Sequence, residues 1–328
     1  MRRLEARHDR FALNAPFRIS RGVKTEANVV TVSVAADDAV GRGEGVPYAR
    51  YGETVESALA AIEAVRGAVE EGADRDALQS LLPPGAARNA VDCALWDLDA
   101  RRSGRDVATH IGNPAPGNIV TAMTIGIDTP EAMARAAMAV ANVPLLKVKV
   151  DADHLEARLR AVRAVVPEAR LIVDPNESWD RVVLEAMQDV LVELRVDLLE
   201  QPVSADDDAW LEGFVSRVPI CADEAIHTAA DLDIVSRRYG YVNVKLDKTG
   251  GLTGALELAA EARTRGLGLM TGCMISSSLS IAPAMHIAAL SDFADLDGPL
   301  WLLEDRAGGV TGAGGVLAPP SPGFWGGA

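Results

Sequence analysis

From residue 149 onwards, charged residues recur at regular intervals along this 328-residue chain, each at the end of a short apolar segment. Five of them follow one another, Lys149, Asp174, Glu200, Asp223 and Lys245, separated by 25, 26, 23 and 22 residues. One strand followed by one helix fits such an interval. Because parallel strands present their carboxyl ends on the same side, the spacing predicts a parallel sheet or barrel with these side chains gathered at its mouth.

Eight short apolar segments fit the strands of such a barrel. They are Val120–Ile127, Leu145–Val150, Leu171–Asp174, Val196–Glu200, Ile220–Asp223, Val242–Leu246, Leu267–Gly272 and Phe293–Asp297. Between them, helices are expected at His154–Val166, Arg181–Leu194, Asp206–Arg217 and Leu252–Arg265. The pattern predicts the α/β class and, over residues 116–302, a modified (β/α)8 barrel of the TIM-like (β/α)7β kind.

Residues 1–115 do not repeat the strand–helix pattern. Asn28–Val34 alternates between apolar and polar residues and precedes the glycine-rich Gly41–Gly45, which indicates an antiparallel meander. Helical spacing follows at Glu53–Glu71 and from about Ala86 to Arg102. We therefore expect an N-terminal α+β capping domain. The tail from about residue 303 to 328, rich in Gly and Pro, is expected to fold back onto it.

Charge and cysteine content limit the partners and the compartment. The formal net charge of −15 argues against nucleic acid and against an anionic membrane surface. No apolar run approaches the 18 residues of a membrane span. Cys93, Cys221 and Cys273 are far apart, which fits reduced thiols in a cytoplasmic protein. The sequence leaves open whether the chain forms a homo-oligomer.

Asp174, Glu200 and Asp223 would place three carboxylates on adjacent strands. Without a compensating charge they would repel and raise one another's pKa values. A hard divalent cation resolves the conflict, and a carboxylate set without histidine or cysteine favours Mg²⁺ over zinc. The sequence therefore predicts one Mg²⁺ per subunit.

Lys149 and Lys245 end the second and sixth predicted strands, which lie opposite each other in an eight-stranded barrel. They would approach a substrate from opposite faces, as needed to remove a proton from one face of a carbon and return one to the other. A carbanion formed next to a carboxylate would be stabilised by the metal as an enediolate. Lys147 shares a strand face with Lys149. Its charge and that of the metal are expected to lower the pKa of Lys149 into the range of a base.

Asp295 and Asp297 stand two residues apart at the end of the eighth predicted strand. With this spacing both side chains are expected to face the interior. The pair could bind a cation such as a substrate ammonium group. Two solvated loop aspartates are the alternative.

With these motifs the chain resembles the enolase superfamily, its muconate-lactonizing subgroup and, within that, the dipeptide epimerases. The motifs are Pro47–Glu53, Gly85–Leu98, Lys147–Lys149, Asp174–Asn176, Glu200–Pro202, Ala222–Glu224, Lys245–Gly251 and Asp295–Asp297. The metal and lysine motifs indicate only the subgroup. The paired aspartates indicate a dipeptide with a free amino terminus.

The resemblance implies a role for each matched residue. Lys149 and Lys245 would be the acid/base pair, and Asp174, Glu200 and Asp223 the Mg²⁺ ligands. Lys147 would contact the substrate carboxylate, and Asp295 and Asp297 would hold the amino group. Thr124 and the segment Gly272–Met274, which includes Met274, match positions that contact substrate, and Asn176 and Glu224 would support the metal ligands. Pro175 departs from the family, which usually has a small residue such as Ala there.

Two first-domain segments, Phe17–Asn28 and Val46–Glu53, resemble the loops that close over the site in the family. Arg18, Arg21 and Lys24 in the first segment offer cationic partners for the side-chain carboxylate of a glutamyl residue. Solvated surface charge is the alternative for each of them.

Together these features predict a Mg²⁺-dependent isomerase that interconverts L-Ala-L-Glu and L-Ala-D-Glu by two-base 1,1-proton transfer, in murein peptide turnover. Another activity of the subgroup stays open: a dipeptide epimerase of different specificity, an N-acylamino acid racemase or an o-succinylbenzoate synthase. A Schiff-base lyase would use a barrel lysine without a metal, leaving the three carboxylates unexplained. A metal-holding binding protein would not need two opposed lysines.

Overall fold

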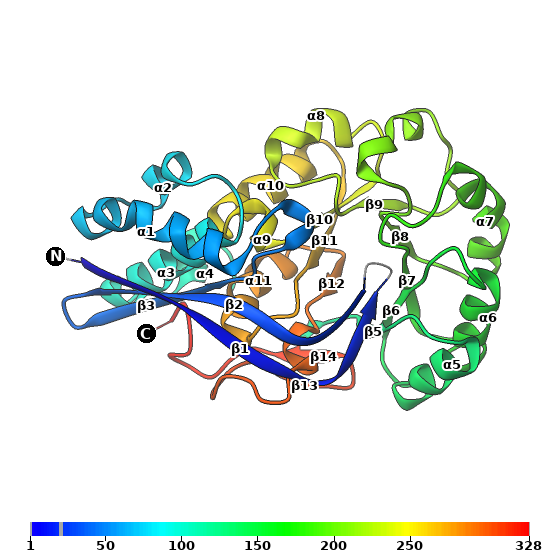
Figure 1. Ribbon diagram of the computed structural model, residues 1–328, viewed down its shortest axis with the longest axis horizontal. Coiled ribbons are helices and arrows are strands. Elements are labelled where there is room, and N and C mark those ends of the chain that lie inside the picture. Colours follow the sequence, from blue (N-terminus) through cyan, green and yellow to red (C-terminus); the bar gives the residue numbers. More distant parts are fainter. Residues whose placement is uncertain (1, 20–21, 328) are drawn as a thin grey trace.

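The computed structural model describes residues 2–19 and 22–327. In Figure 1 an N-terminal sheet with its helices lies beside a barrel, and the red C-terminal tail runs back from the barrel towards the sheet. Arg21 lies outside the described residues, so the structure says nothing about its predicted role.

Three antiparallel strands form the N-terminal sheet, in the order β1-β2-β3. The sheet and its helices confirm the predicted meander and the two predicted helices. The elements are β1 (Arg2–Ile19), β2 (Gly22–Ala36), β3 (Ala39–Gly45), the 3₁₀ turn η1 (Ala49–Tyr51), α1 (Val55–Glu71), α2 (Arg75–Leu81), α3 (Ala86–Ser103) and α4 (Val107–Ile111).

Helix α3 rests directly on the backbone of strand β3. Gly41, Gly43 and Gly45 share one strand face, and a Cβ on any of them would lie 2.1 Å from a carbonyl oxygen of α3. Alanines spaced four residues apart, Ala86, Ala90 and Ala94, supply those carbonyls. The glycines and alanines therefore fix how closely the helix approaches the sheet.

We expect Gly43→Ala to lower the free energy of unfolding by about 1–3 kcal/mol, the usual cost of overpacking a filled site. Gly67 on α1 is the matched control, because a Cβ there would meet no atom within 4 Å. Gly67→Ala should stabilise the protein by about 0.5–1 kcal/mol, since alanine is the better helix former. Urea unfolding of both variants measures the difference, and equal effects would contradict the close helix–strand contact.

Eight parallel strands form the barrel in chain order from β5 to β12. They are β5 (Met123–Ile125), β6 (Leu145–Lys149), β7 (Arg170–Asp174), β8 (Leu198–Glu200), β9 (Ile220–Ala222), β10 (Tyr241–Val244), β11 (Gly268–Gly272) and β12 (Phe293–Asp295). The backbone N–H of Ala122 donates to the carbonyl of Ala294 at 2.8 Å and links the first strand to the last. The predicted barrel with an N-terminal α+β domain is confirmed.

Helices and short turns follow the barrel strands. They are α5 (Pro130–Ala139), α6 (Leu155–Val165), α7 (Arg181–Glu193), η2 (Ala205–Asp207), η3 (Ala209–Leu211), η4 (Ala229–Asp231), α8 (Leu232–Val235), α9 (Leu246–Thr249), α10 (Leu252–Thr264), α11 (Ser278–Ala288) and η5 (Gly298–Trp301). Among the described residues, no helix combines the length and the apolar character needed to cross a bilayer.

The helix predicted at Asp206–Arg217 is wrong, because two single 3₁₀ turns stand in its place. Asp208 in this segment is buried and accepts a hydrogen bond from the Tyr239 hydroxyl at 2.6 Å. Gly213 then takes a left-handed conformation with φ of 90°. A left-handed glycine cannot continue a right-handed helix.

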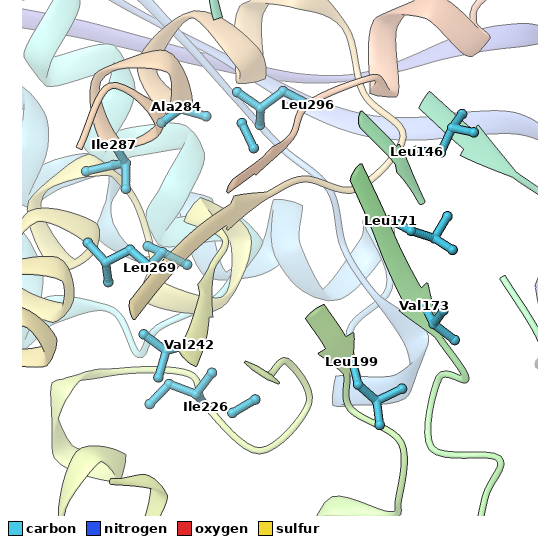
Figure 2. Close-up of a cluster of buried hydrophobic side chains, with 14 of the residues drawn as sticks. Leu146, Leu171, Val173, Leu199, Ile226, Val242, Leu269, Ala284, Ile287 and Leu296 are labelled. Atoms are coloured by element: carbon cyan, nitrogen blue, oxygen red, sulfur yellow. The ribbon is translucent and has the colours of Figure 1, made fainter. Parts of the chain in front are cut away.

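Alternation along the barrel strands separates two environments. Leu146, Leu171 and Leu199 project from their strands, as Figure 2 shows, and belong to the same apolar cluster as Leu159 of α6 and Leu184 of α7. A smaller apolar cluster fills the barrel interior: Ala122, Leu145, Ile172, Leu198, Cys221, Met270 and Phe293. The charged residues occur one or two inward positions further along the same strands, so they lie above this apolar layer.

The C-terminal tail contacts both regions. Strands β13 (Thr311–Ala313) and β14 (Val316–Ala318) form a small sheet with β4 (Ile119–Val120). Further on, the indole N–H of Trp325 donates to the carbonyl of Arg42 in β3 at 2.9 Å. The domain limits, 1–115 with the tail and 116–302, stay our prediction.

Candidate active site

A pocket that is partly open to solvent lies at the carboxyl ends of the barrel strands. Its lining contains most of the predicted site residues: Lys24, Thr124, Lys147, Lys149, Asn176, Asp223, Glu224, Lys245, Met274, Asp295 and Asp297. Asp174 and Glu200 lie behind this lining and are fully buried. Arg18 is exposed and is not part of the pocket wall.

Lys147 lies at the centre of a carboxylate cluster. Its Nζ is 2.6 Å from Glu200 Oε2, 2.7 Å from Asp295 Oδ2 and 3.0 Å from Asp174 Oδ2. Burial alone would lower the pKa of Lys147, but the carboxylates of Asp174, Asp295 and Glu200 outweigh it and hold that pKa well above its usual value.

Lys149 shares a carboxylate oxygen with Lys147. Its Nζ donates to Asp174 Oδ2 at 2.5 Å and to Asn176 Oδ1 at 3.0 Å. Asp174 Oδ2 contacts both ammonium groups and offsets their repulsion.

Asp174 is ionised and held in place by its neighbours. Burial raises the pKa of Asp174, but the ammonium groups of Lys147 and Lys149 outweigh burial and lower this pKa to about 2. Its Oδ1 accepts the backbone N–H of Asn176 at 2.9 Å. The turn through Pro175 thus keeps both Asp174 and Asn176 at Lys149.

Asp223 is bound by two lysines on the opposite side of the mouth. Lys245 Nζ donates to Asp223 Oδ2 at 2.7 Å, and Lys248 Nζ donates to Oδ1 at 2.7 Å and to the backbone carbonyl at 2.6 Å. Burial raises the pKa of Asp223, but Lys245 and Lys248 together with Lys147 pull it well below its usual value. Asp223 is therefore an anion.

Glu200 is the least compensated of the three predicted metal ligands. Asn243 donates to its Oε1 at 2.8 Å, whereas Oε2 accepts no hydrogen bond from the described residues, although the Lys147 ammonium is close. Burial, and then repulsion from Asp174, raises the pKa of Glu200 to about 7. An added positive charge at this point would be favourable.

The carboxylate oxygens at the mouth of the barrel are of the chemical type that a hard divalent cation prefers. In the structure the carboxylates pair with lysines, and no three ligand side chains of the described residues have the geometry of a metal site. However, oxygens from Asp174, Glu200 and Asp295 already converge on one cationic group, the Lys147 ammonium. All of these oxygens are hard donors, as Mg²⁺ requires.

Asp295 and Asp297 face the pocket together, as their spacing predicted. Asp297 Oδ2 accepts the backbone N–H of Thr124 at 2.9 Å and the indole N–H of Trp301 at 3.2 Å. Burial and the nearby Asp295 raise the pKa of Asp297 to about 6. Asp295 Oδ1 is buried and accepts no hydrogen bond within the described chain. The interpretation as solvated loop residues is therefore wrong.

Two models of known families match the chain. The mandelate racemase / muconate lactonizing enzyme N-terminal domain matches residues 1–112, and the enolase C-terminal domain-like model matches residues 131–324. The chain belongs to the mandelate racemase / muconate lactonizing enzyme family. The predicted superfamily and the predicted enzyme class, isomerase, are confirmed.

Relatives of this mandelate racemase / muconate lactonizing enzyme family member cover nearly its whole length. The L-Ala-D/L-Glu epimerase of Escherichia coli (strain K12) is 48% identical over 307 residues, covering 93% of this chain and 96% of that protein. The N-acetyl-D-glutamate racemase of a Pseudoalteromonas species is 43% identical over 302 residues, covering 92% and 96%.

A solved enolase family member from Agrobacterium tumefaciens superimposes with a TM-score of 0.97 at 48% identity, covering 99% of this chain and all of that one. That protein has homology to dipeptide epimerases and was solved with bound sodium and L-Ala-L-Glu. Similar dipeptide epimerases have been solved with Mg and a dipeptide, so the predicted cofactor is confirmed for proteins of this kind.

Several pocket residues of this family member were not singled out from the sequence. Phe17, Tyr48 and Tyr51 line the pocket, and the Lys248 ammonium donates to the Asp223 carboxylate. The signal was partly present, because both tyrosines lie in the motif Pro47–Glu53 and Lys248 lies in the motif Lys245–Gly251. Neither motif shows by itself which side chains turn inwards.

Proposed function

We propose that this protein is a dipeptide epimerase that interconverts L-Ala-L-Glu and L-Ala-D-Glu by 1,1-proton transfer. One observation carries the proposal. Lys149 ends β6 and Lys245 follows β10, four strands away in an eight-stranded barrel, and both side chains line the same pocket. Two lysine nitrogens on opposite sides of one carbon, one a neutral base and the other a protonated acid, are what inversion at that carbon needs.

The chain's own side chains supply the acid/base chemistry. Whichever lysine is neutral takes the α-proton from one face, and the other, as an ammonium, returns a proton to the opposite face. Asp174 and Asp223 contact Lys149 and Lys245 and fix where each nitrogen stands. Mg²⁺ held by Asp174, Glu200 and Asp223 would supply positive charge beside the substrate carboxylate, where negative charge builds up. Lys147 would contact that carboxylate, and Asn176 and Glu224 would support the ligand positions.

Asp295 and Asp297 would select a free amino terminus. The buried Oδ1 of Asp295 accepts no hydrogen bond from the described residues. A substrate ammonium group would satisfy it and would offset the repulsion between the two carboxylates. Thr124 and Met274 complete this side of the pocket wall.

Recognition of the glutamyl side chain is assigned to the first-domain loops. Lys24 lines the pocket, and its Nζ lies 4.9 Å from the centre of the Tyr48 ring. We assign Lys24, together with Arg21, to the distal carboxylate. Support comes from two similar proteins that are named for a glutamyl or glutamate substrate. The proposed role in murein peptide turnover rests on the identity of this substrate.

The proposal is tested by the α-proton NMR signal of the glutamyl residue in D₂O with Mg²⁺. We expect the signal to disappear from both L-Ala-L-Glu and L-Ala-D-Glu as the two epimers interconvert. Asp295→Asn should lower kcat/KM for the dipeptide by about 10–100-fold, the effect of losing one charge-assisted contact of about 1.5–3 kcal/mol. Persistence of the signal with every dipeptide tried would rule out the epimerase function.

A racemase of N-acetylglutamate is the second candidate, favoured by the 43% identical relative. Its substrate has no ammonium group, so it offers no cationic partner for Asp295. In the wild type, the α-proton of N-acetyl-D-glutamate should therefore exchange far more slowly than that of the dipeptide. Asp295→Asn should reduce the difference between these two exchange rates. Faster exchange of the N-acetyl compound would favour racemase function instead.

A further inference from the structure

The turn that follows Lys245 is fastened to the capping domain by one buried carboxylate. Asp247 Oδ1 accepts the backbone N–H of Val46 and the side-chain N–H of Asn89, both at 2.8 Å. Asp247 is 4% exposed, and Val46 is 4% exposed. One oxygen therefore joins the turn after a site lysine, the start of the segment 46–53 and helix α3.

Asp247 is coupled to Lys245 through the backbone. Lys245 is extended, and helix α9 starts at the next residue. The Lys245 carbonyl accepts the N–H groups of Lys248 and Thr249, both at 3.0 Å. The single turn of α9 thus closes on Lys245 itself, so a shift of the turn would move the backbone that carries the Lys245 side chain.

Helix α3 holds the far end of the same turn. Arg88 Nη2 donates to the Thr249 carbonyl at 2.7 Å, and Arg88 Nε donates to the Gly250 carbonyl at 3.3 Å. A Cβ on Gly250 would lie 2.2 Å from Arg88, so the helix fills all the space over the turn. The opposite side of α3 rests on the β3 glycines, which leaves the helix little freedom to move.

The segment 46–53 is fastened to the opposite side of the mouth as well. Arg50 donates from Nε and Nη2 to the carboxylate of Glu177 at 3.0 and 3.1 Å. Glu177 follows Asn176, which contacts Lys149. The segment is therefore tied at one end to the Lys245 turn and near its middle to the loop beside Lys149.

We propose that Asp247 is a positioning residue that sets the place of Lys245 relative to the substrate by anchoring the α9 turn to Val46 and Asn89. The inference rests on the proposed function of Lys245 as one of two bases. We expect only the proton transfer made by Lys245 to change, because Lys149 is carried by a different strand and a different loop.

The test compares Asp247→Ala with Asp247→Asn. Alanine leaves both N–H donors without an acceptor, whereas the asparagine side-chain oxygen can still accept from both. Initial rates of α-proton exchange in D₂O are measured separately from L-Ala-L-Glu and from L-Ala-D-Glu. Asp247→Ala should slow exchange by about 10–100-fold for the epimer whose α-proton faces Lys245. Exchange of the other epimer should change less than about threefold, and Asp247→Asn should behave like the wild type.

Arg50→Met is the matched control at the other attachment of the segment 46–53. If loosening this segment were the whole effect, Arg50→Met and Asp247→Ala would raise KM alike and leave the ratio of the two exchange rates unchanged. That outcome would overturn the proposal, as would failure of Asp247→Asn to restore the ratio. If Asp247→Ala does not fold, Asn89→Ala removes one of the two donors and should shift the ratio in the same direction.

A crystal structure of Asp247→Ala gives a reading that does not depend on the substrate. We expect the α9 turn and the Lys245 ammonium to shift from their wild-type positions. If the α9 turn kept its position and the distance from Lys245 Nζ to Asp223 Oδ2 stayed at 2.7 Å, the proposal would be contradicted. If the wild type exchanged neither epimer, the proposed function would fail while the crystal structure still tested the role of Asp247.

Discussion

Lys245→Ala is expected to lower the rate of epimerisation by about 10²–10⁴-fold, the usual contribution of a positioned acid or base. Exchange of the α-proton with solvent should persist for one epimer, because Lys149 can still remove and return a proton on its own face. Lys149→Ala should show the opposite preference. Proton NMR in D₂O, started from each pure epimer, measures both exchange and inversion.

Lys245→Arg separates loss of the base from damage to the site. The guanidinium can keep the ion pair with Asp223 but stays protonated, so it cannot accept a proton. In either variant Asp223 keeps Lys248, whose ammonium lies 2.7 Å from Oδ1, so the buried carboxylate is not left alone. If both variants lost exchange equally for both epimers, the two-base assignment would be wrong.

Much of the barrel was predictable because its strands follow one rule. Residues two apart face the same way, so Lys147 and Lys149, or Asp295 and Asp297, could be placed inwards from sequence alone. By contrast, strand β1 was not predicted. Leu4 is fully buried between the exposed Arg3 and Glu5, but His8 and Arg10 lie at the same parity as Leu4 and are exposed, so the alternation does not continue along the strand.

Charge compensation within the site was harder to predict than residue identity. The sequence placed two lysines side by side but did not show that Asp174 Oδ2 contacts both of them. It also gave no sign that Lys248 would reach Asp223 from the turn after β10. Such contacts depend on side-chain reach across strands, and strand periodicity does not encode that reach.

The same limit applies to the contacts between the two regions. The motifs Gly85–Leu98 and Lys245–Gly251 were recognised separately, and the structure shows that they contact each other through Arg88 and Asn89. Neither motif predicts this contact, because their partners are more than 150 residues apart in the chain.

Removal of Mg²⁺ should lower the rate of epimerisation by at least about 10³-fold if the cation stabilises the negative charge of the transition state by about 4 kcal/mol or more. It should also destabilise the fold, since a ligand that binds only the native state adds about 2.7 kcal/mol at 100 times its Kd. Thermal unfolding across Mg²⁺ concentrations measures this effect without a substrate.

Glu200→Gln tests whether the carboxylate cluster carries that stabilisation. Asn243 can still donate to the amide oxygen, but one of three anions is lost, so Mg²⁺ should raise the Tm of this variant far less than that of the wild type.

Glu193→Gln on α7 changes the net charge equally and is the matched control, because Glu193 is an exposed partner of Arg160. The Tm of this control should respond to Mg²⁺ as the wild type does. An unchanged Mg²⁺ response in Glu200→Gln, or full activity after EDTA treatment, would exclude the three-carboxylate site. The raised pKa of Glu200, about 7, gives the reason for a large effect: burial and Asp174 disfavour its anion, and a cation at this point removes that cost.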